Sequence, residues 1–189
     1  WEKSLDKSVY FIDAPISGGP EGAKSGTLTI MCGGDSIAFE KIKPILEMMG
    51  SSVVHMGGAG TGTTMKLVNQ LLTSVNTVAS IEALLLADES GIDVKSALSV
   101  LKTSFGYSKM VERNVPYFAK KRFENSSAPI RNLEKDLKII LDLSKMLNLE
   151  LPLTKTSLNI FSETNKLDLV EPDMSAISLY IKELGKNNE

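Results

Sequence analysis

The hydrophobic and polar positions of this chain change their period near residue 57. Before that point, short apolar runs rich in β-branched and aromatic residues alternate with one helical pattern, whereas beyond it almost every segment repeats its apolar residues with a helical period. The runs predict strands over residues 9–13, 27–32 and 52–55. The pattern therefore indicates a short α/β region followed by a long helical one.

One helix is expected between the second and third strands, over residues 36–49. Asp35 offers an N-cap for it and Gly50 a C-cap. Pro44 lies inside the pattern and should kink or interrupt this helix, because proline lacks the backbone N–H that a helix interior uses.

The rest of the chain predicts a series of helices separated by Gly, Pro and Asx residues. The longest covers residues 63–89 and should end at Gly91. The last should begin at the N-cap Asp173 and end at Gly185. In order, the helices expected after the longest one cover residues 93–102, 108–122, 131–147, 153–166 and 174–184.

Three strands and one helix cannot close a core alone, and a strand-rich part followed by a helix-rich part usually means two layers or two domains. The predicted fold is mainly α with a small α/β remnant: the last strands of a doubly wound sheet, a long interdomain helix, and then an all-helical domain. The expected domains are residues 1–57 and 58–189. The strands over 9–13 and 27–32 are expected to leave unpaired edges, through which copies of the chain would associate.

The composition is that of an ordinary globular protein, with 42% hydrophobic and 23% charged residues. The net charge of −2 comes without a clustered basic excess, so no nucleic-acid partner is expected. Cys32 is the only cysteine and is expected to be a buried, inert thiol, and His55 is the only histidine. We therefore predict neither a disulfide nor a metal site.

The same sequence gives an expected location. No apolar stretch approaches the roughly 18 residues that cross a bilayer. Residues 1–6 have neither the basic region nor the apolar core of a signal peptide. We expect a soluble protein of the cytoplasm or of an organelle matrix, without a membrane partner.

A polar stripe runs along the predicted long helix, which is otherwise made largely of Leu and Val. It consists of Lys66, Asn69, Gln70, Thr73 and Asn76, which follow one another at helical spacing. The solvent-exposed face of an amphipathic helix would give the same pattern. However, Asn and Thr are poor helix formers for a surface position. The stripe also begins just after a glycine-rich entry, where a helix N-terminus is able to bind an anion.

Lys66 is the candidate catalytic residue of this stripe. It lies in the first turns of the predicted helix, at the positive end of the helix dipole. Because the ammonium form is disfavoured there, we expect the pKa of Lys66 to fall toward the range of a general acid/base.

A second candidate site is the segment Asp13-Ala-Pro-Ile-Ser-Gly-Gly19, in which a strand ends at Pro15 and a turn follows. Ser17, Gly18 and Gly19 combine a hydroxyl with backbone that a ligand can approach closely, and this combination suits a carboxylate. Ser-Gly-Gly also serves as a plain turn, so the chemistry alone leaves both interpretations open.

Two further segments are weaker candidates. Residues 57–62 are rich in glycine and join a strand to a helix, but their spacing differs from the dinucleotide-binding G-x-G-x-x-G. The acidic residue expected about 20 positions further on, Glu82, would fall inside the long helix, so this turn is not predicted to bind a cofactor. Lys135 opens another helix in Asn132-Leu-Glu-Lys-Asp-Leu137, which by itself fits a solvated charged face.

Taken in order, these segments resemble the β-hydroxyacid dehydrogenase family, which includes 3-hydroxyisobutyrate dehydrogenase and tartronate semialdehyde reductase. The similarity covers nearly the whole chain. Each motif alone is unspecific, but the ordered set is specific. The set comprises Phe11-Ile-Asp-Ala-Pro-Ile-Ser-Gly-Gly19, Ser25-Gly-Thr-Leu-Thr-Ile-Met31 with Gly33-Gly-Asp35, the segment from Phe39 to Gly50, the glycines Gly57, Gly60 and Gly62 with Lys66-x-x-Asn69, and Lys135-Asp-Leu137.

The resemblance implies a Rossmann-like dinucleotide-binding domain followed by a helical domain that commonly oligomerises, with NAD or NADP as cofactor. Lys66 matches the catalytic lysine, which handles the proton of the substrate hydroxyl. The Ser17-Gly18-Gly19 turn matches the site of the substrate carboxylate, and Asn69 matches the amide that orients the substrate. Lys135 matches a lysine that reaches the nicotinamide end of the cofactor site.

A complete member of this family would have about 100 further residues ahead of Trp1. This chain is therefore expected to lack most of the dinucleotide-binding domain and to be inactive alone. The implied function is that of a portion of an oxidoreductase that interconverts a small 3-hydroxy acid and its semialdehyde. The alternative is an inactive interaction or oligomerisation module derived from such an enzyme.

Overall fold

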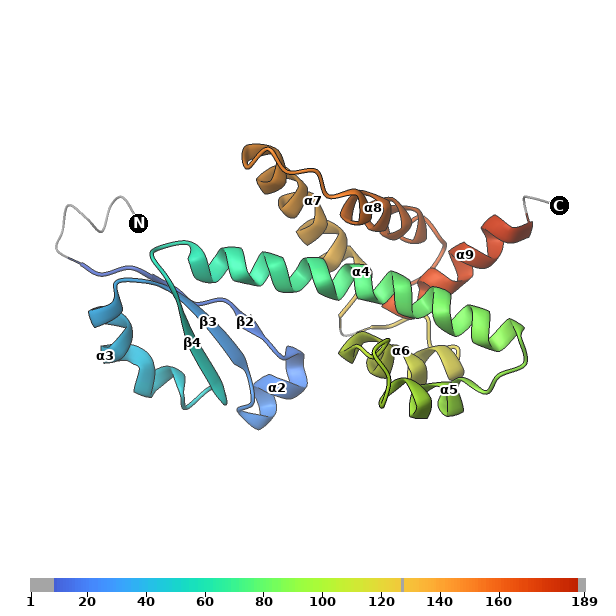
Figure 1. Ribbon diagram of the computed structural model, residues 1–189, viewed down its shortest axis with the longest axis horizontal. Helices are drawn as coiled ribbons and strands as arrows, with labels where there is room; N and C mark the ends of the chain where they lie inside the picture. Colours follow the sequence, from blue (N-terminus) through green and yellow to red (C-terminus); the bar gives the residue numbers. More distant parts are fainter. Residues whose placement is uncertain (1–8, 127, 187–189) are drawn as a thin grey trace. The chain divides into compact units, whose positions relative to one another are not determined.

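The computed structural model of the chain describes residues 9–126 and 128–186 (Figure 1). Residues 1–6, in which no signal peptide is expected, lie outside this part. The chain divides into two compact units, one up to Asn69 and one from Gln70 onward, and each is considered by itself. The elements are β1 (Ile12–Asp13), β2 (Ile16–Ser17), α2 (Gly19–Ser25), β3 (Thr29–Gly34), α3 (Ser36–Leu46), β4 (Ser52–Gly57), α4 (Thr61–Glu89), α5 (Val94–Leu101), α6 (Lys109–Ala119), α7 (Ile130–Met146), α8 (Pro152–Thr164), the 3-10 helix η1 (Met174–Ala176) and α9 (Ile177–Lys186).

The first unit contains a four-stranded sheet centred on β3. β3 pairs in parallel with β4 and antiparallel with both β1 and β2, so that Ile30 lies opposite Val53 on one side and Ile16 on the other. The prediction that residues 27–32 leave an unpaired strand edge is therefore wrong, because β3 is hydrogen-bonded along both edges. The edges of the described sheet belong to the short strands β1 and β2 and to β4.

A small apolar core lies between this sheet and α3, which contacts β3 and β4 (Figure 1). Cys32 is fully buried in it, as predicted. Burial raises the pKa of the Cys32 thiol above its ordinary value, and the charge of Asp13 adds to this effect. The core consists of Leu28, Ile30, Cys32 and Phe39, with Ile12, Ala14, Leu46 and Val53 packed against it.

Helix α3 begins as predicted and ends earlier. The Asp35 carboxylate accepts the Ala38 N–H at 2.9 Å and so caps the helix. Pro44 is inside α3, which ends two residues later with Glu47, not Gly50, as its C-cap. The reason for a glycine at position 50 is different: a Cβ there would lie 2.4 Å from the Leu28 carbonyl oxygen, so this glycine permits a close approach of two backbones.

The short helix α2 was not expected from the pattern. It directly follows the predicted Ser-Gly-Gly turn and has Pro20 in its first turn, where the missing proline N–H has no cost. It ends at Gly26, whose φ of 66° lies in the left-handed region that closes many helices. Proline near the start and glycine at the end are the signals that mark this helix in the sequence.

Helix α4 spans 29 residues and ends close to Gly91, as predicted. By length and composition it could cross a membrane, with a mean hydropathy of 1.3 over an 18-residue window, of which 39% is buried inside the structure. A core helix has the same composition, and α4 contributes four buried apolar side chains to the second unit. We therefore interpret it as a core helix. These side chains are Val78, Ile81, Leu84 and Leu85.

The second unit is all-helical, which confirms the predicted fold class of a mainly α protein with a small sheet. Helices α5 to α8 lie within three residues of their predicted limits. The segment predicted as one last helix begins with the turn η1, capped by Asp173 as expected, and continues as α9. Gly185 lies inside α9, so its predicted role as terminator is wrong.

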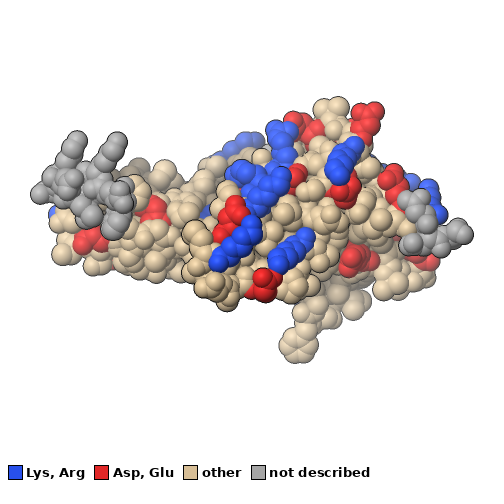
Figure 2. All heavy atoms as spheres, turned by 90° about the horizontal axis from the view of Figure 1, so that it is seen from above, with Lys and Arg blue, Asp and Glu red and all other residues tan. Residues whose placement is uncertain are grey.

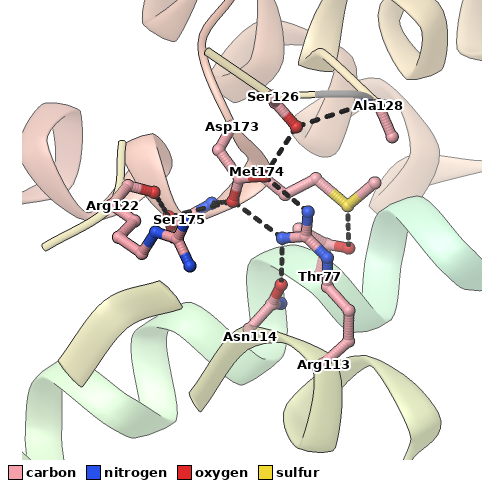
Figure 3. A network of polar contacts seen from close by, with 9 residues as sticks. All are labelled: Thr77, Arg113, Asn114, Arg122, Ser126, Ala128, Asp173, Met174 and Ser175. Atoms are coloured by element: carbon pink, nitrogen blue, oxygen red, sulfur yellow. Dashed lines mark hydrogen bonds and ion pairs between the residues drawn. The ribbon is translucent and has the colours of Figure 1, made fainter. Parts of the chain in front are cut away.

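Buried polar side chains connect α4 to the helices around it (Figure 3). The Asn114 side-chain amide of α6 donates to the Ser80 hydroxyl of α4 at 2.7 Å. The Thr77 hydroxyl of α4 lies 3.7 Å from the Met174 sulfur of η1. These contacts fix α4 against α6 and η1 in addition to the apolar packing.

Charged side chains of both signs are mixed on the face of the molecule drawn in Figure 2. Within α7, Lys138 and Glu134 form an ion pair at 2.7 Å, and Lys145 and Asp142 form one at 3.0 Å. Such exposed pairs contribute little to stability, typically about 0.2–1 kcal/mol. On this face, the arrangement is that of a solvated surface.

Candidate active site

The Ser17-Gly18-Gly19 turn joins β2 to α2 in the first unit. Gly18 and Gly19 have φ angles of 135° and 63°, which L side chains rarely adopt. A Cβ on Gly18 would also lie 3.1 Å from Cδ2 of Leu28. This backbone conformation therefore requires glycine at both positions. A turn with negative φ angles would accept other residues there.

The same turn is accessible. Ser17 is half-buried, whereas Gly18 and Gly19 are exposed. The Gly18 carbonyl accepts the Gly22 N–H at 3.0 Å, which fixes the turn against the first residues of α2. A hydroxyl beside exposed glycine backbone on a fixed turn is chemically suited to a carboxylate. The role of these residues in binding a substrate stays a prediction.

The N-terminal end of α4 is bound by the carboxylate of Asp13, the last residue of β1. Asp13 Oδ1 accepts the Gly60 N–H at 2.7 Å, and Oδ2 accepts the Thr63 N–H at 2.6 Å and the Thr63 hydroxyl at 2.9 Å. Burial works to raise the pKa of the Asp13 carboxyl, but the hydrogen bonds from Gly60 and Thr63 outweigh it and hold the pKa below its ordinary value. The anion expected at this helix end is thus the chain's own Asp13.

Two glycines allow this close approach. A Cβ on Gly33 would lie 2.5 Å from Asp13 Oδ1 and 2.7 Å from the Gly62 nitrogen. A Cβ on Gly62 would lie 2.3 Å from the Met31 carbonyl oxygen. Since neither position has room for a side chain, β1, β3 and the first turn of α4 meet at a junction that only glycine permits.

The glycine-rich residues 57–62 do not fit a dinucleotide pyrophosphate. A pyrophosphate at a strand-to-helix turn is held by backbone N–H groups of the turn and of the first helical turn. Here the N–H groups of Gly60 and Thr63 already donate to Asp13, and the Thr61 N–H donates to the Gly58 carbonyl at 3.1 Å. This turn therefore has no proposed role in binding the cofactor.

The polar stripe of α4 is not the most exposed face of the helix. Its five members, from Lys66 to Asn76, are all half-buried, whereas the apolar Val68 and Leu72 are 44% and 53% exposed. A simple solvated stripe would show the opposite order. The burial pattern therefore favours a role for the stripe in polar contacts over the interpretation of a solvent-exposed helix face.

Lys66 and Asn69 lie within the first three turns of α4, on the part of this helix that belongs to the first unit. Lys66 follows Thr63, a residue bound by Asp13, by three positions. The carboxylate brings a negative charge to the same helix end and so opposes the effect of the helix dipole on Lys66. The pKa of Lys66 and its catalytic role stay predictions.

Lys135 lies on α7 in the second unit, and its side chain is 68% exposed. Its ammonium is 3.0 Å from Oδ1 of Asp136, and Oδ2 of Asp136 accepts the side-chain N–H of Gln70 at 2.7 Å. No role was predicted for Asp136, yet its carboxylate contacts both Lys135 and Gln70 of α4. Nothing in the local pattern announces this contact, because Gln70 is 66 positions away.

Two family models of dehydrogenases match the chain. Residues 60–181 match the model described as NAD-binding of NADP-dependent 3-hydroxyisobutyrate dehydrogenase. Residues 2–58 match the NAD binding domain of 6-phosphogluconate dehydrogenase. The chain is thus of the class of NAD(P)-dependent oxidoreductases. More particularly, it belongs to the β-hydroxyacid dehydrogenase family, as the ordered motifs predicted.

Individual proteins agree with this assignment. The chain is 34% identical over 174 residues to 2-(hydroxymethyl)glutarate dehydrogenase of Eubacterium barkeri, covering 92% of this chain and 58% of that protein. It is 39% identical over 152 residues to 2-hydroxy-3-oxopropionate reductase of Escherichia coli, covering 80% and 52%. The crystal structure of 3-hydroxyisobutyrate dehydrogenase from Salmonella typhimurium matches with a TM-score of 0.84 at 30% identity, covering 95% and 63%. The chain therefore spans little more than half the length of these curated relatives.

Proposed function

We propose that the protein containing this chain interconverts a small 3-hydroxy acid and its semialdehyde with NAD or NADP, and that Lys66 is its general acid/base. Membership of the β-hydroxyacid dehydrogenase family carries this proposal. The names of the relatives from Eubacterium barkeri and Escherichia coli both describe oxidoreductases of small hydroxy or oxo acids. The half-buried position of Lys66 and Asn69 on one helix face supports the assignment of the site.

The proposed chemistry assigns each residue to one atom of the substrate. The Ser17-Gly18-Gly19 turn would hold the carboxylate, and Asn69 would orient the hydroxyl-bearing carbon toward Lys66. As the carbon gives up a hydride and becomes a carbonyl, neutral Lys66 takes the hydroxyl proton, and in the reverse direction its ammonium returns that proton. NAD(P), when bound, supplies the acceptor and donor of the hydride.

Lys135 is proposed to reach the nicotinamide end of the cofactor site in the whole protein. The pyrophosphate is proposed to bind outside the described residues, because the N–H groups of Gly60 and Thr63 donate to Asp13 and that of Thr61 donates to the Gly58 carbonyl. The chain spans 58% and 52% of the length of these two relatives, and the proposal assigns the pyrophosphate to another part of the whole protein.

The test uses the whole protein that contains this chain, with and without Lys66→Arg. Arginine keeps the positive charge but cannot take up a proton near neutral pH, so kcat should fall by about 100-fold or more. Lys95→Arg on α5, an exposed lysine outside the site, serves as the matched control and should leave turnover unchanged. Unchanged kcat and an unchanged pH–rate profile for Lys66→Arg would contradict the role of Lys66.

A second candidate function is a non-catalytic oligomerisation module. Exposed apolar side chains in the second unit favour it, among them Leu72 at 53%, Leu86 at 72% and Phe105 fully exposed. A sizing column and an activity assay, both applied to this chain and to a longer version, separate the two functions. Activity in the longer protein supports the enzyme, whereas stable oligomers without activity in either protein support the module.

A further inference from the structure

We propose that Asp13 is a positioning residue, which holds the Ser17-Gly18-Gly19 turn and the first turns of α4 in a fixed relation. Both segments belong to the first unit, and the inference rests on the proposed function of that turn and of Lys66. Asp13 itself is not assigned any contact with a substrate. It would act through the two backbones that it joins.

The geometry of the carboxylate is the first observation. Each of its oxygens accepts one backbone N–H from the entry of α4, and Oδ2 also accepts the Thr63 hydroxyl. The three distances lie between 2.6 and 2.9 Å, the range of charge-assisted hydrogen bonds. These bonds span 47 and 50 positions of sequence, so they join two parts of the chain that no local structure would hold together.

The position of Asp13 in the chain is the second observation. On one side it precedes Ser17 by four residues, and the segment between them is fixed to β3, because the Pro15 carbonyl accepts the Met31 N–H at 3.0 Å. On the other side, Thr63 precedes Lys66 by three residues of continuous helix. If the carboxylate moved, both the Ser17-Gly18-Gly19 turn and Lys66 would therefore move with it, because the connecting segments are short and rigid.

The packing around the carboxylate is the third observation. Gly33 and Gly62 leave no room for even one additional carbon atom beside Asp13 and the first turn of α4. A residue of different shape at position 13 would have to move the junction itself. The junction is built to hold one carboxylate in one place.

Asn is the most specific test at position 13, because its side chain has the shape of Asp but only one acceptor oxygen. The Asn side chain has a single acceptor oxygen, so its NH₂ group would face the N–H of either Gly60 or Thr63, two donors in contact. The junction would loosen without a change in side-chain volume. Since misplacement of a reacting group by about 1 Å costs on the order of 100-fold in rate, a modest loosening should be visible in turnover.

The experiment compares Asp13→Asn with Asp35→Asn in the whole protein. Asp35 is a matched control, because it also caps a helix of the first unit, through one bond to the Ala38 N–H, and has no role in the proposed site. Hydrogen exchange of backbone amides is measured in both variants, together with kcat and KM. We expect Asp13→Asn to accelerate exchange over residues 60–66 and 16–19 together and to lower kcat/KM at least tenfold. Asp35→Asn should affect only the first turn of α3 and leave kcat/KM within twofold.

Three results would overturn the proposal: normal kcat/KM in an Asp13→Asn protein with accelerated exchange, acceleration confined to residues 60–66, or equal losses of kcat/KM in both variants. If the wild-type protein shows no turnover with 3-hydroxy acids, the proposed function fails, and the exchange pattern alone decides whether Asp13 joins the two segments. If Asp13→Asn does not fold, Thr63→Ala removes only the hydroxyl bond to Oδ2. It should then show the same joint acceleration to a smaller degree, and no acceleration over residues 16–19 would contradict the proposal.

Discussion

Arg113 donates to both carboxylate oxygens of Asp173, with Nη1–Oδ1 at 2.7 Å and Nη2–Oδ2 at 2.5 Å (Figure 3). The Asp173 side chain is 1% exposed and that of Arg113 is 25% exposed. Asp173 also accepts the Ser126 hydroxyl at 2.8 Å and the Ser175 N–H at 2.9 Å. One buried carboxylate thus joins α6, the segment before α7 and the start of η1.

Substitution of Asp173 by Asn should destabilise the fold strongly. The Arg113 charge would remain partly buried without its counter-charge, and such a loss typically costs about 3–5 kcal/mol of the free energy of unfolding. Glu89→Gln is the control, because it breaks only an exposed ion pair with Lys182, at 2.8 Å, and should lower stability far less. Urea denaturation measures both, and similar losses in the two variants would contradict the importance of the buried pair.

The same carboxylate predicts how stability depends on pH. Burial works to raise the pKa of Asp173, but Arg113 and the Ser175 N–H outweigh it and hold the pKa below its ordinary value. A carboxyl with a lower pKa in the folded chain contributes stability that is complete above the unfolded pKa of about 3.9 and is lost as the pH falls through the folded pKa. The urea midpoint should therefore be flat near neutrality and fall below about pH 4. Asp173→Asn should show a shallower fall, and a steeper one would contradict this account.

Ser74 predicts a substitution that stabilises the protein. Its hydroxyl is fully buried on α4 and has no hydrogen-bond partner among the described residues. Ser74→Ala removes an unsatisfied polar group and improves helix propensity, so the free energy of unfolding should rise by about 1 kcal/mol.

Ser80→Ala is the matched control for Ser74→Ala. Ser80 is 5% exposed on the same helix, but its hydroxyl accepts the Asn114 amide at 2.7 Å and donates to the Thr77 carbonyl at 2.8 Å. Its removal should cost about 1–3 kcal/mol, because the buried side-chain NH₂ group of Asn114 loses its Ser80 acceptor. The midpoint of thermal unfolding should rise in Ser74→Ala and fall in Ser80→Ala. A lower midpoint in Ser74→Ala would indicate that the Ser74 hydroxyl has a hydrogen-bond partner in the wild-type protein.

Gly62→Ala should disturb the first unit more than its small volume suggests. The new methyl group would meet the Met31 carbonyl oxygen at 2.3 Å, and backbone cannot move aside as a flexible side chain can. We expect a loss of about 1–3 kcal/mol, the usual cost of overpacking. Gly58→Ala, with nothing within 4 Å of the added carbon, should stay within about 0.5 kcal/mol of wild type. Chemical denaturation distinguishes the two, and equal effects would be inconsistent with the junction described.

Lys135→Ala separates stability from the proposed role of Lys135 in the cofactor site. The side chain is 68% exposed, so the free energy of unfolding should change by less than about 0.5 kcal/mol. In the whole protein, KM for NAD or NADP should rise. Lys138→Ala, on the same helix at 60% exposure, should leave that KM unchanged. A Lys135→Ala protein with unaltered KM for both cofactors would remove Lys135 from the proposed site.

The sequence predicted the helices of the second unit better than the strands of the first. Helical periodicity and the cap Asp173 act within a few residues, so they are visible in the pattern. The strand predicted over residues 9–13 shortened to Ile12–Asp13. A strand requires a partner, and no local pattern indicates which residues of β3 are available for pairing.

Glycines were the residues most often misinterpreted. Gly50 and Gly185 looked like helix ends, yet the first allows a close backbone contact and the second lies inside the last turns of α9. The site shows the same limit. Helical spacing placed Lys66 and Asn69 on one face and position suggested an acid/base role for Lys66, but the role of Asn69 came only from the family resemblance. The contacts of Asp13 with Gly60 and Thr63 and of Asp136 with Gln70 could not be predicted, because these partners lie 47 to 66 positions away.

The junction at the entry of α4 also changes the interpretation of the glycine-rich turn in this chain. A strand, a cluster of glycines and a helix together look like a phosphate loop, but here the negative charge comes from the protein itself and the glycines serve the contact between backbones. The entry of α4 is therefore a packed backbone junction, and the anion bound at this helix end is the side chain of Asp13. A search that ranks nucleotide sites by glycine content would select this segment, although the N–H groups of Gly60 and Thr63 already donate to Asp13.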